Sequence, residues 1–290
     1  MKPTRPLLRY HGGKFLLAPW IISHFPEHRI YVEPFGGAAS VLLRKPRSYA
    51  EVYNDLEGEV VNIFRILQRP RQAASLIRLL KLTPFARAEF ELSYIPSKSP
   101  VEQARRTIIR AFMGFGSNSV NSARATAVGF RCMGHVHTKK PSTGFRANSN
   151  RSGTVPAHDW VNYPDALKAI VERLQGVVIE NRDARKCMLQ HDTPETLHYC
   201  DPPYMKAVRA DAADDYHYEM TDDDHVQLAE FLHELKGMVI ISGYDCPLYE
   251  RIYRSWQKAS RKALADGARA RVETIWLSPN INMGRLFQEP

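Results

Sequence analysis

The stretch R-I-Y-V-E-P-F-G-G at residues 29–37 begins as a short apolar strand and ends in a turn that contains two adjacent glycines. We expect a helix over 38–44, and then a second strand over 49–53 that leads into Asp55. Apolar residues at helical spacing follow in 57–68 and predict a further helix. A strand, a glycine turn, a helix and a strand ending in an acid are typical of the first half of a Rossmann-like sheet.

Helices and strands continue to alternate along the rest of the chain. The predicted fold class is therefore α/β, with a sheet domain at 1–70 and 176–290 and an inserted, mostly helical, basic subdomain at 71–175. Further strands are predicted at 177–180, 197–200, 238–242 and 272–277. Further helices are predicted at 16–25, 72–81, 85–94, from Ser99-Pro100 onward, 164–174 with Gly176 as its C-cap, 221–236 with Thr221 as its N-cap, and 247–256.

The positive charge of the chain is concentrated in one segment. The net charge is +9, and the nine bases between Glu102 and Asp159, where no acid occurs, account for all of it. A solvated surface normally mixes both signs of charge. The segment is therefore better explained by binding to nucleic acid than as a loop that happens to be basic. Within it, residues 114–156 have no periodicity, which indicates either a functional insertion or a partly disordered segment. The bases that we expect to bind nucleic acid are Arg124, Arg131, Lys139, Lys140, Arg146 and Arg151.

Composition argues against several other classes of protein. No apolar run reaches the roughly 18 residues of a membrane-spanning helix, and no signal-peptide pattern is present. The four cysteines lie far apart, so we expect reduced thiols and a cytoplasmic location. Cys132, His135 and His137 have irregular spacing and no evident fourth ligand, so we expect no metal site.

The sequence Asp201-Pro202-Pro203-Tyr204 follows the strand predicted at 197–200. Prolines cannot extend the hydrogen-bond ladder, so the strand ends in a carboxylate, free carbonyls and an aromatic ring. Asp201 and the Pro202 carbonyl can accept the two N–H bonds of an exocyclic amino group, while Tyr204 stacks on the heterocycle. These residues alone leave adenine and cytosine open as acceptors.

A second group of residues suits a cofactor that carries a ribose. Asp55 comes roughly 20 residues after Gly36 and Gly37, where an acid accepts hydrogen bonds from ribose hydroxyls. No phosphate-binding G-x-x-x-x-G-K-[ST] loop occurs, so S-adenosylmethionine fits better than a nucleoside triphosphate. The stretch Y-H-G-G-K at 10–14 offers a close turn, a cation and a stacking face, although a capped helix start would explain it equally well.

Four motifs in this order resemble those of the DNA adenine-N6 methyltransferases of the Dam, or D12, class: Y-H-G-G-K at 10–14, V-E-P-F-G-G-A at 32–38, Y-N-D at 53–55 and D-P-P-Y at 201–204. The likeness is closest to phage-type members, extends over nearly the whole chain and includes the run at 144–153. The chain departs from the family's F-x-G-x-G pattern at Ala39. The resemblance implies an S-adenosylmethionine-dependent methyltransferase sheet, an inserted target-recognition subdomain and double-stranded DNA as partner, with a cognate restriction endonuclease acting separately.

The resemblance also implies roles for individual residues. Asp55 would bind the ribose of the cofactor, Asp183 its adenine, and Asp201 would lie between cofactor and target. The implied cofactor-binding residues are Tyr10, Gly13, Lys14, Phe35, Gly36, Gly37, Asp55, Asp183 and Asp201. The implied catalytic residues are Asp201, Pro202, Pro203 and Tyr204.

The expected reaction is transfer of the methyl group of S-adenosylmethionine to an adenine that is flipped out of the duplex and stacks on Tyr204. Residues 205–219 would then form either a loop that closes over this base or a solvated connection. Two alternatives stay open: a cytosine-N4 DNA methyltransferase, and a catalytically silent DNA-binding protein on the same fold.

Overall fold

The structure is a computed structural model that describes residues 2–116, 120, 130–132, 135–137, 144–146, 155–205, 218–264 and 270–281. The chain forms two compact units. The sheet unit comprises Leu16–Leu56, Gly176–Asp214 and Tyr218–Pro290, and the helical unit consists mainly of Met1–Phe15 and Glu57–Gln175. The division into a catalytic and a recognition domain at residues 70 and 176 stays a prediction.

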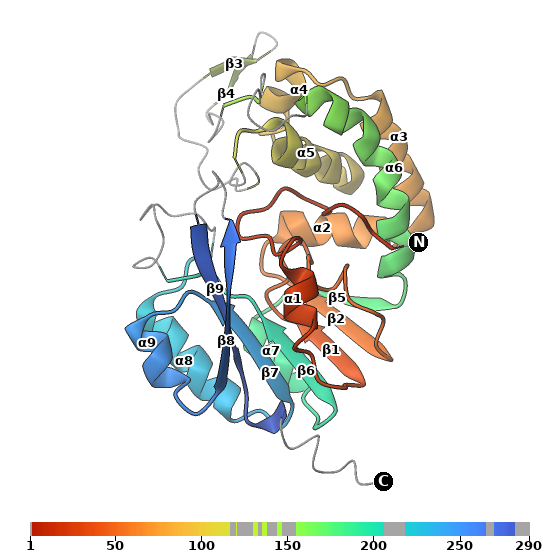
Figure 1. Ribbon diagram of the computed structural model, residues 1–290. Helices are drawn as coiled ribbons and strands as arrows, with labels where there is room; N and C mark the ends of the chain where they lie inside the picture. The colour runs from red at the N-terminus through yellow and green to blue at the C-terminus, as the bar shows by residue number, and fades with distance from the viewer. Residues whose placement is uncertain are drawn as a thin grey trace. The chain divides into compact units, whose positions relative to one another are not determined.

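Within the described residues, the sheet unit contains one seven-stranded sheet in the order β5-β2-β1-β6-β7-β9-β8 (Figure 1). The five strands from β5 to β7 run parallel, whereas β9 is antiparallel to β7 and β8. The predicted α/β class is confirmed. The strands are β1 (Ile30–Glu33), β2 (Ala50–Asn54), β5 (Val177–Glu180), β6 (Thr196–Cys200), β7 (Met238–Gly243), β8 (Gln257–Leu264) and β9 (Ala270–Leu277).

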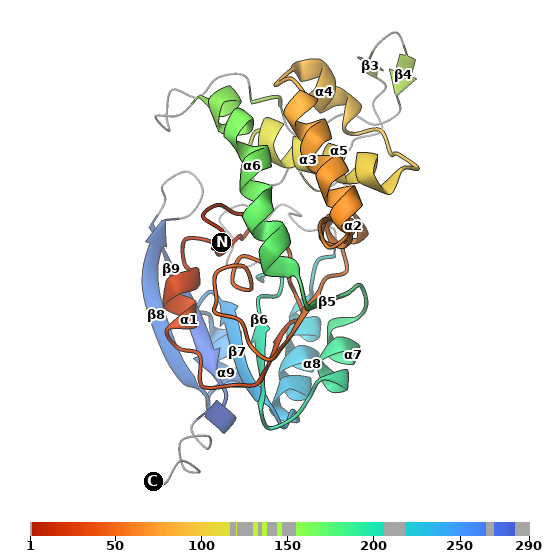
Figure 2. The ribbon, with the colours of Figure 1, turned by 90° about the vertical axis from the view of Figure 1, so that its right-hand side faces the viewer.

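The two faces of the sheet carry different side chains. Alternate residues such as Val32 and Ile241 pack in an apolar cluster with α7 (Ala184–Gln190), α8 (Asp222–His233) and α9 (Pro247–Ile252). The side chains of Tyr31 and Tyr199 point to the opposite face, where both rings contact Phe25, which follows α1 (Ala18–Ile22). Figure 2 shows α7 and α8 on one face of the sheet and α1 on the other.

Residues 38–44 do not form the predicted helix, but a series of turns. The backbone N–H of Leu42 donates to Oε2 of Glu33 at 2.8 Å, so it is lost to a helical ladder. Ala39 has a φ of 52°, in the left-handed region that ends a right-handed helix. The prediction was wrong because a buried carboxylate competes with the backbone for this donor.

The helical unit contains five described helices and a short hairpin. In α6, Pro164 lies inside the helix, although we expected it to begin there. The helix begins instead at Pro156. The buried side chains of Trp160 and Tyr163 hold its first half in place. The indole N–H of Trp160 donates to the carbonyl of Thr83 at 2.8 Å. The elements are α2 (Gly58–Leu67), α3 (Pro70–Leu82), α4 (Arg87–Leu92), α5 (Pro100–Met113), α6 (Pro156–Leu174), β3 (Phe130–Cys132) and β4 (His135–His137). None of the described helices combines the length and the apolar character that crossing a membrane requires.

Three of the nine bases between Glu102 and Asp159 are used inside the helical unit. Arg105 binds Glu102 at 2.7 Å and Glu89 at 2.8 Å, and Arg106 also binds Glu102. The buried Arg110 pairs with Glu59 of α2, which joins α5 to α2. These arginines have an internal structural role, so fewer of the nine bases are available to DNA.

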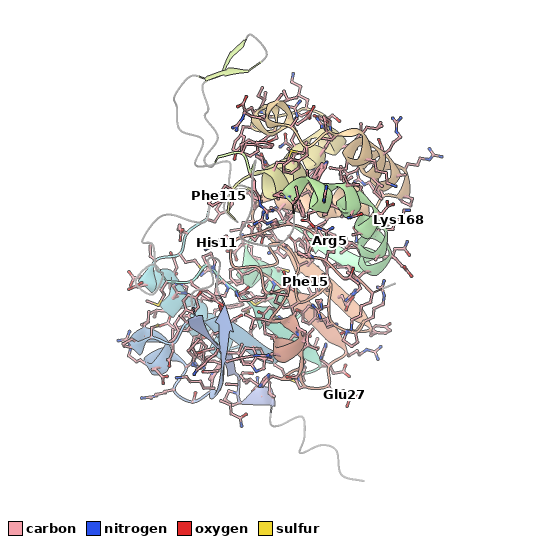
Figure 3. The ribbon with its side chains drawn as sticks, turned by 45° about the horizontal axis from the view of Figure 1, so that its top comes forward. Arg5, His11, Phe15, Glu27, Phe115 and Lys168 are labelled. Carbon is pink, nitrogen blue, oxygen red and sulfur yellow. The ribbon has the colours of Figure 1, made fainter. Side chains whose placement is uncertain are left out.

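Replacing Glu59 by alanine is expected to destabilise the protein by about 3 kcal/mol, because the guanidinium of Arg110 would stay buried without its carboxylate. Urea unfolding of the full chain measures this loss. The control is Asp165→Ala, which removes an exposed carboxylate that pairs with Lys81 and Lys168. The side chain of Lys168 extends outward from α6 (Figure 3). The control should leave the unfolding midpoint unchanged. Equal losses in the two variants would contradict the structural role of the Glu59–Arg110 pair.

Candidate active site

The order of the strands creates a switch point between β1 and β6. From β1 the chain continues to β2 on one side, and from β6 it continues to β7 on the other. Connections that leave two neighbouring strands in opposite directions open a crevice outside their carboxyl ends, where α/β proteins bind their ligands. At this point β1 leads into residues 34–37 and β6 leads into residues 201–204.

The glycine turn after β1 is held against the end of β2. The N–H of Gly36 donates to the carbonyl of Asn54 at 2.8 Å, and the N–H of Gly37 donates to Oδ2 of Asp55 at 2.7 Å. The hydroxyl of Tyr53 donates to the carbonyl of Gly37 at 2.7 Å. A Cβ on Gly36 would lie 2.2 Å from the Tyr53 ring, so only glycine allows this approach. The turn and Asp55 therefore form one fixed unit.

Asn54 connects the turn to the neighbouring edge strand. Its side chain is fully buried, and its amide nitrogen donates to the carbonyls of Pro34 at 2.9 Å and Arg182 at 3.0 Å. Its amide oxygen accepts the N–H of Arg182 at 3.0 Å. Asp183 follows directly and caps α7 by accepting the N–H of Lys186. A single side chain thus aligns the ends of β1, β2 and β5; the Y-N-D motif contained it, but the sequence predicted no role for it.

Glu33 is a buried carboxyl group at the end of β1. Its Oε2 accepts the hydroxyl of Tyr31 at 2.7 Å and the N–H of Leu42 at 2.8 Å. Burial raises the pKa of Glu33 to about 8, and the charge of Asp201 adds to this increase. Glu33 is therefore mostly protonated at pH 7. The sequence around Glu33, a strand residue followed by a proline and a glycine turn, contained no signal that this carboxyl group would be buried and protonated.

The Asp201–Tyr204 segment lies half-buried to buried at the end of β6. The residue Tyr204 is 6% exposed. Its ring makes an edge contact with the Tyr244 ring, with 4.7 Å between the ring centroids, and its hydroxyl donates to Oε2 of Glu273 at 2.9 Å. Burial, and then the charges of Asp201 and Glu273, raise the pKa of Tyr204 well above its ordinary value, so the hydroxyl stays protonated. Glu273 was not predicted, because it lies on β9, about 70 residues away in sequence.

The structure brings part of the predicted site together. The predicted residues at the carboxyl edge of the sheet unit are Phe35, Gly36, Gly37, Asp55, Asp183, Asp201, Pro202, Pro203 and Tyr204. Tyr10, Gly13 and Lys14 belong to the helical unit instead. There, the N–H of Gly13 donates to the carbonyl of Tyr10, and Nζ of the buried Lys14 donates to the carbonyl of Gly12 at 2.7 Å. The close turn expected at 10–14 is thus present.

Only Arg146, of the six bases predicted to bind DNA, has a described side chain. Its pKa is lowered by partial burial and then by the like charge of Arg9. Its N–H donates to the carbonyl of Met113 at 2.7 Å, and the neighbouring Phe145 ring packs on Phe85. Arg131 lies on β3, but its side chain falls outside the described residues, and so do Arg124, Lys139, Lys140 and Arg151. The same holds for the side chains of Cys132, His135 and His137 and for residues 206–217 of the expected loop.

Comparison with known proteins identifies a family and several relatives. The model of the D12 class N6 adenine-specific DNA methyltransferases matches residues 10–266. A DNA adenine methylase of Vibrio cholerae serotype O1 (strain ATCC 39541 / Classical Ogawa 395 / O395) is 25% identical over 279 residues, which cover 92% of this chain and 93% of the relative. DNA adenine methylases of Salmonella typhi and Escherichia coli (strain K12) are also 25% identical, over 88% of this chain and 86% of each relative.

The raised pKa of Glu33 predicts a pH dependence of stability. An ordinary glutamate titrates near 4.5, so between about pH 5 and pH 8 the folded state keeps a proton that the unfolded state has released. The free energy of unfolding should therefore fall as the pH rises through this window. Glu33→Gln keeps a neutral side chain of the same shape and should lose this contribution.

Urea unfolding of both proteins across the window measures the difference. The stability of Glu33→Gln relative to the natural sequence is expected to increase from pH 5 to pH 8. A difference that stays constant with pH would show that Glu33 is already ionised in the folded protein.

Proposed function

The chain belongs to the D12 class of N6 adenine-specific DNA methyltransferases, and we propose that it transfers the methyl group at the carboxyl edge of its sheet unit, between β1 and β6. One observation carries this proposal. The Asp201–Tyr204 segment ends β6 at the switch point, beside the strand whose glycine turn is bonded to Asp55. The seven-stranded sheet is consistent with an S-adenosylmethionine-dependent methyltransferase.

The residues at this edge suit S-adenosylmethionine as the methyl donor. Because Gly36 has no side chain, the turn packs directly against the Tyr53 ring and is held beside Asp55. The carboxylate of Asp55 is the group that ribose hydroxyls require, and Asp183 adds an acceptor at the end of the next strand. Phe35 and Gly37 complete the proposed cofactor set at this edge, and the roles of Tyr10, Gly13 and Lys14 of the helical unit stay predictions from the resemblance. When bound, the cofactor supplies an electrophilic methyl group on a sulfonium.

Asp201 and Pro202 are the proposed acceptors for the target base. The Asp201 carboxylate and the Pro202 carbonyl would take the two N–H bonds of the adenine N6 amino group. These bonds favour a pyramidal nitrogen whose lone pair is available, and the carboxylate stabilises the positive charge that develops on it. Glu33 holds its proton at neutral pH, so it adds no second negative charge beside Asp201.

Tyr204 is the proposed stacking surface for the adenine. Because an amino group inside a duplex cannot reach the edge of a sheet, the base must leave the helix, and an aromatic face offsets part of the cost of unstacking. The new bond joins N6 to the methyl carbon as the carbon–sulfur bond breaks. The methylated nitrogen then releases its extra proton to water, so Asp201 need not be a strong base.

The two alternative functions are less well supported than adenine-N6 methyl transfer. Cytosine-N4 transfer is not favoured, because both the family and the relatives are adenine-specific by name. The intact D-P-P-Y segment argues against a catalytically silent DNA-binding protein. We propose the cytoplasm as the compartment, because the thiols of Cys187, Cys200 and Cys246 are free and buried. A phage origin and a separate restriction endonuclease stay predictions.

Asp201→Ala is expected to lower methyl transfer by about a thousandfold or more, because it removes the charge that stabilises the transition state. Transfer of tritiated methyl groups from S-adenosylmethionine to unmethylated genomic DNA measures the rate, and fluorescence anisotropy measures DNA affinity, which should largely survive. The matched control is Glu234→Ala, which removes an exposed carboxylate at the far end of α8. Turnover by Asp201→Ala at the control's rate would overturn the mechanism.

Arg146→Ala is expected to weaken DNA binding and to reduce the steepness of its salt dependence by about one unit of log affinity per unit of log salt concentration. The like charge of Arg9 supports this assignment, because an anion placed there would relieve the repulsion. Anisotropy titrations over a range of salt concentrations measure the slope. Lys168→Ala, on α6, is the control with the same change in charge. An unchanged slope for Arg146→Ala would remove this residue from the phosphate contacts.

A further inference from the structure

The hydroxyl of Tyr204 is anchored by a residue from the antiparallel part of the sheet. Glu273 lies on β9, one residue before Thr274, which pairs with Gly243 at the carboxyl end of β7. Its Oε2 accepts the Tyr204 hydroxyl at 2.9 Å. Because β9 runs antiparallel to β7, its first residues lie at the same edge of the sheet as Asp201. The antiparallel pair β8–β9 at one edge of the sheet thus contributes a side chain to the proposed site.

We propose that Glu273 is a positioning residue of the methyl transfer: its carboxylate fixes the hydroxyl of Tyr204, and thereby the plane of the ring on which the flipped adenine stacks. The inference rests on the function proposed above. It assigns to β9 a role in catalysis that the D-P-P-Y motif does not contain.

The surroundings of the ring explain why such an anchor matters. The edge contact with Tyr244 supports the Tyr204 ring from one direction. Rotation of the Tyr204 ring about its Cβ–Cγ bond has a broad energy minimum, so the ring plane is well defined only if the hydroxyl at its far end is also held. A hydrogen bond to a carboxylate is stronger than one between neutral groups, and it requires a protonated hydroxyl. Burial keeps the pKa of Tyr204 well above its ordinary value, so the donor is present at every pH at which the enzyme would work.

A small rotation of the ring would move the adenine amino group away from Asp201. In-line transfer depends on the placement of the reacting atoms, and a displacement of about 1 Å costs up to a hundredfold in rate. Loss of the anchor should therefore lower kcat more than it raises KM for DNA. The affinity for S-adenosylmethionine should stay unchanged, because Glu273 has no part in the proposed cofactor set.

The test uses four variants of the full chain: Glu273→Ala, Glu273→Gln, Tyr204→Phe and the double variant Tyr204→Phe/Glu273→Ala. Steady-state transfer of tritiated methyl groups to unmethylated genomic DNA gives kcat and KM, and calorimetry gives the affinity for S-adenosylmethionine. Glu273→Ala and Tyr204→Phe should each lower kcat about tenfold or more. Glu273→Gln keeps an acceptor oxygen and should retain most of the activity. The double variant should be no slower than the slower single variant, because both substitutions remove the same bond.

Three outcomes would overturn the proposal: full activity of Glu273→Ala, losses that multiply in the double variant, or no rescue by Glu273→Gln. Glu234→Ala controls for the loss of one negative charge, which by itself changes the attraction to DNA. Asp201→Ala in the same assay distinguishes a failure of the role proposed for Glu273 from a failure of the proposed site. If it is inactive while Glu273→Ala is fully active, only the role of Glu273 fails; if Asp201→Ala is active, the proposed site itself fails.

Discussion

The parallel pairing of β1 with β6 is the constraint on which the candidate site depends. Its register sets Val32 beside His198, so the two strands end within one residue of each other and release residues 34–37 and 201–204 at the same edge. The chain leaves these strands in opposite directions, which opens the space outside their ends. The buried amide of Asn54 then fixes the turn after β1 to the segment after β5. Cofactor and base residues can therefore share one edge.

Much of this edge could be predicted from the sequence. The strands predicted at 29–32, 49–53 and 197–200, the glycines after the first and the acids after the others carry a local signal, because each depends on its neighbours in sequence. The α/β class was predicted from these patterns and the adenine-specific family from the resemblance of four motifs, and both are confirmed. The roles of the individual site residues stay predictions.

What the sequence did not reveal depends on contacts between distant segments. The helix expected at 38–44 is replaced by turns because Glu33 takes a backbone donor, and Ala39 adopts a left-handed conformation where the family has glycine. The strand β8 reads as a polar segment, since it is the edge strand of the sheet and has no apolar alternation. Glu273 becomes relevant only when the hairpin folds back beside β7.

The most direct test of the shared edge is a crystal structure of the full chain with S-adenosylhomocysteine, the product of the proposed reaction. We expect the ribose hydroxyls to lie within hydrogen-bond distance of Asp55 and the sulfur to face Asp201, with the glycine turn against the ligand. A ligand bound at the opposite edge of the sheet, or with its ribose away from Asp55, would show that the proposed site is wrong.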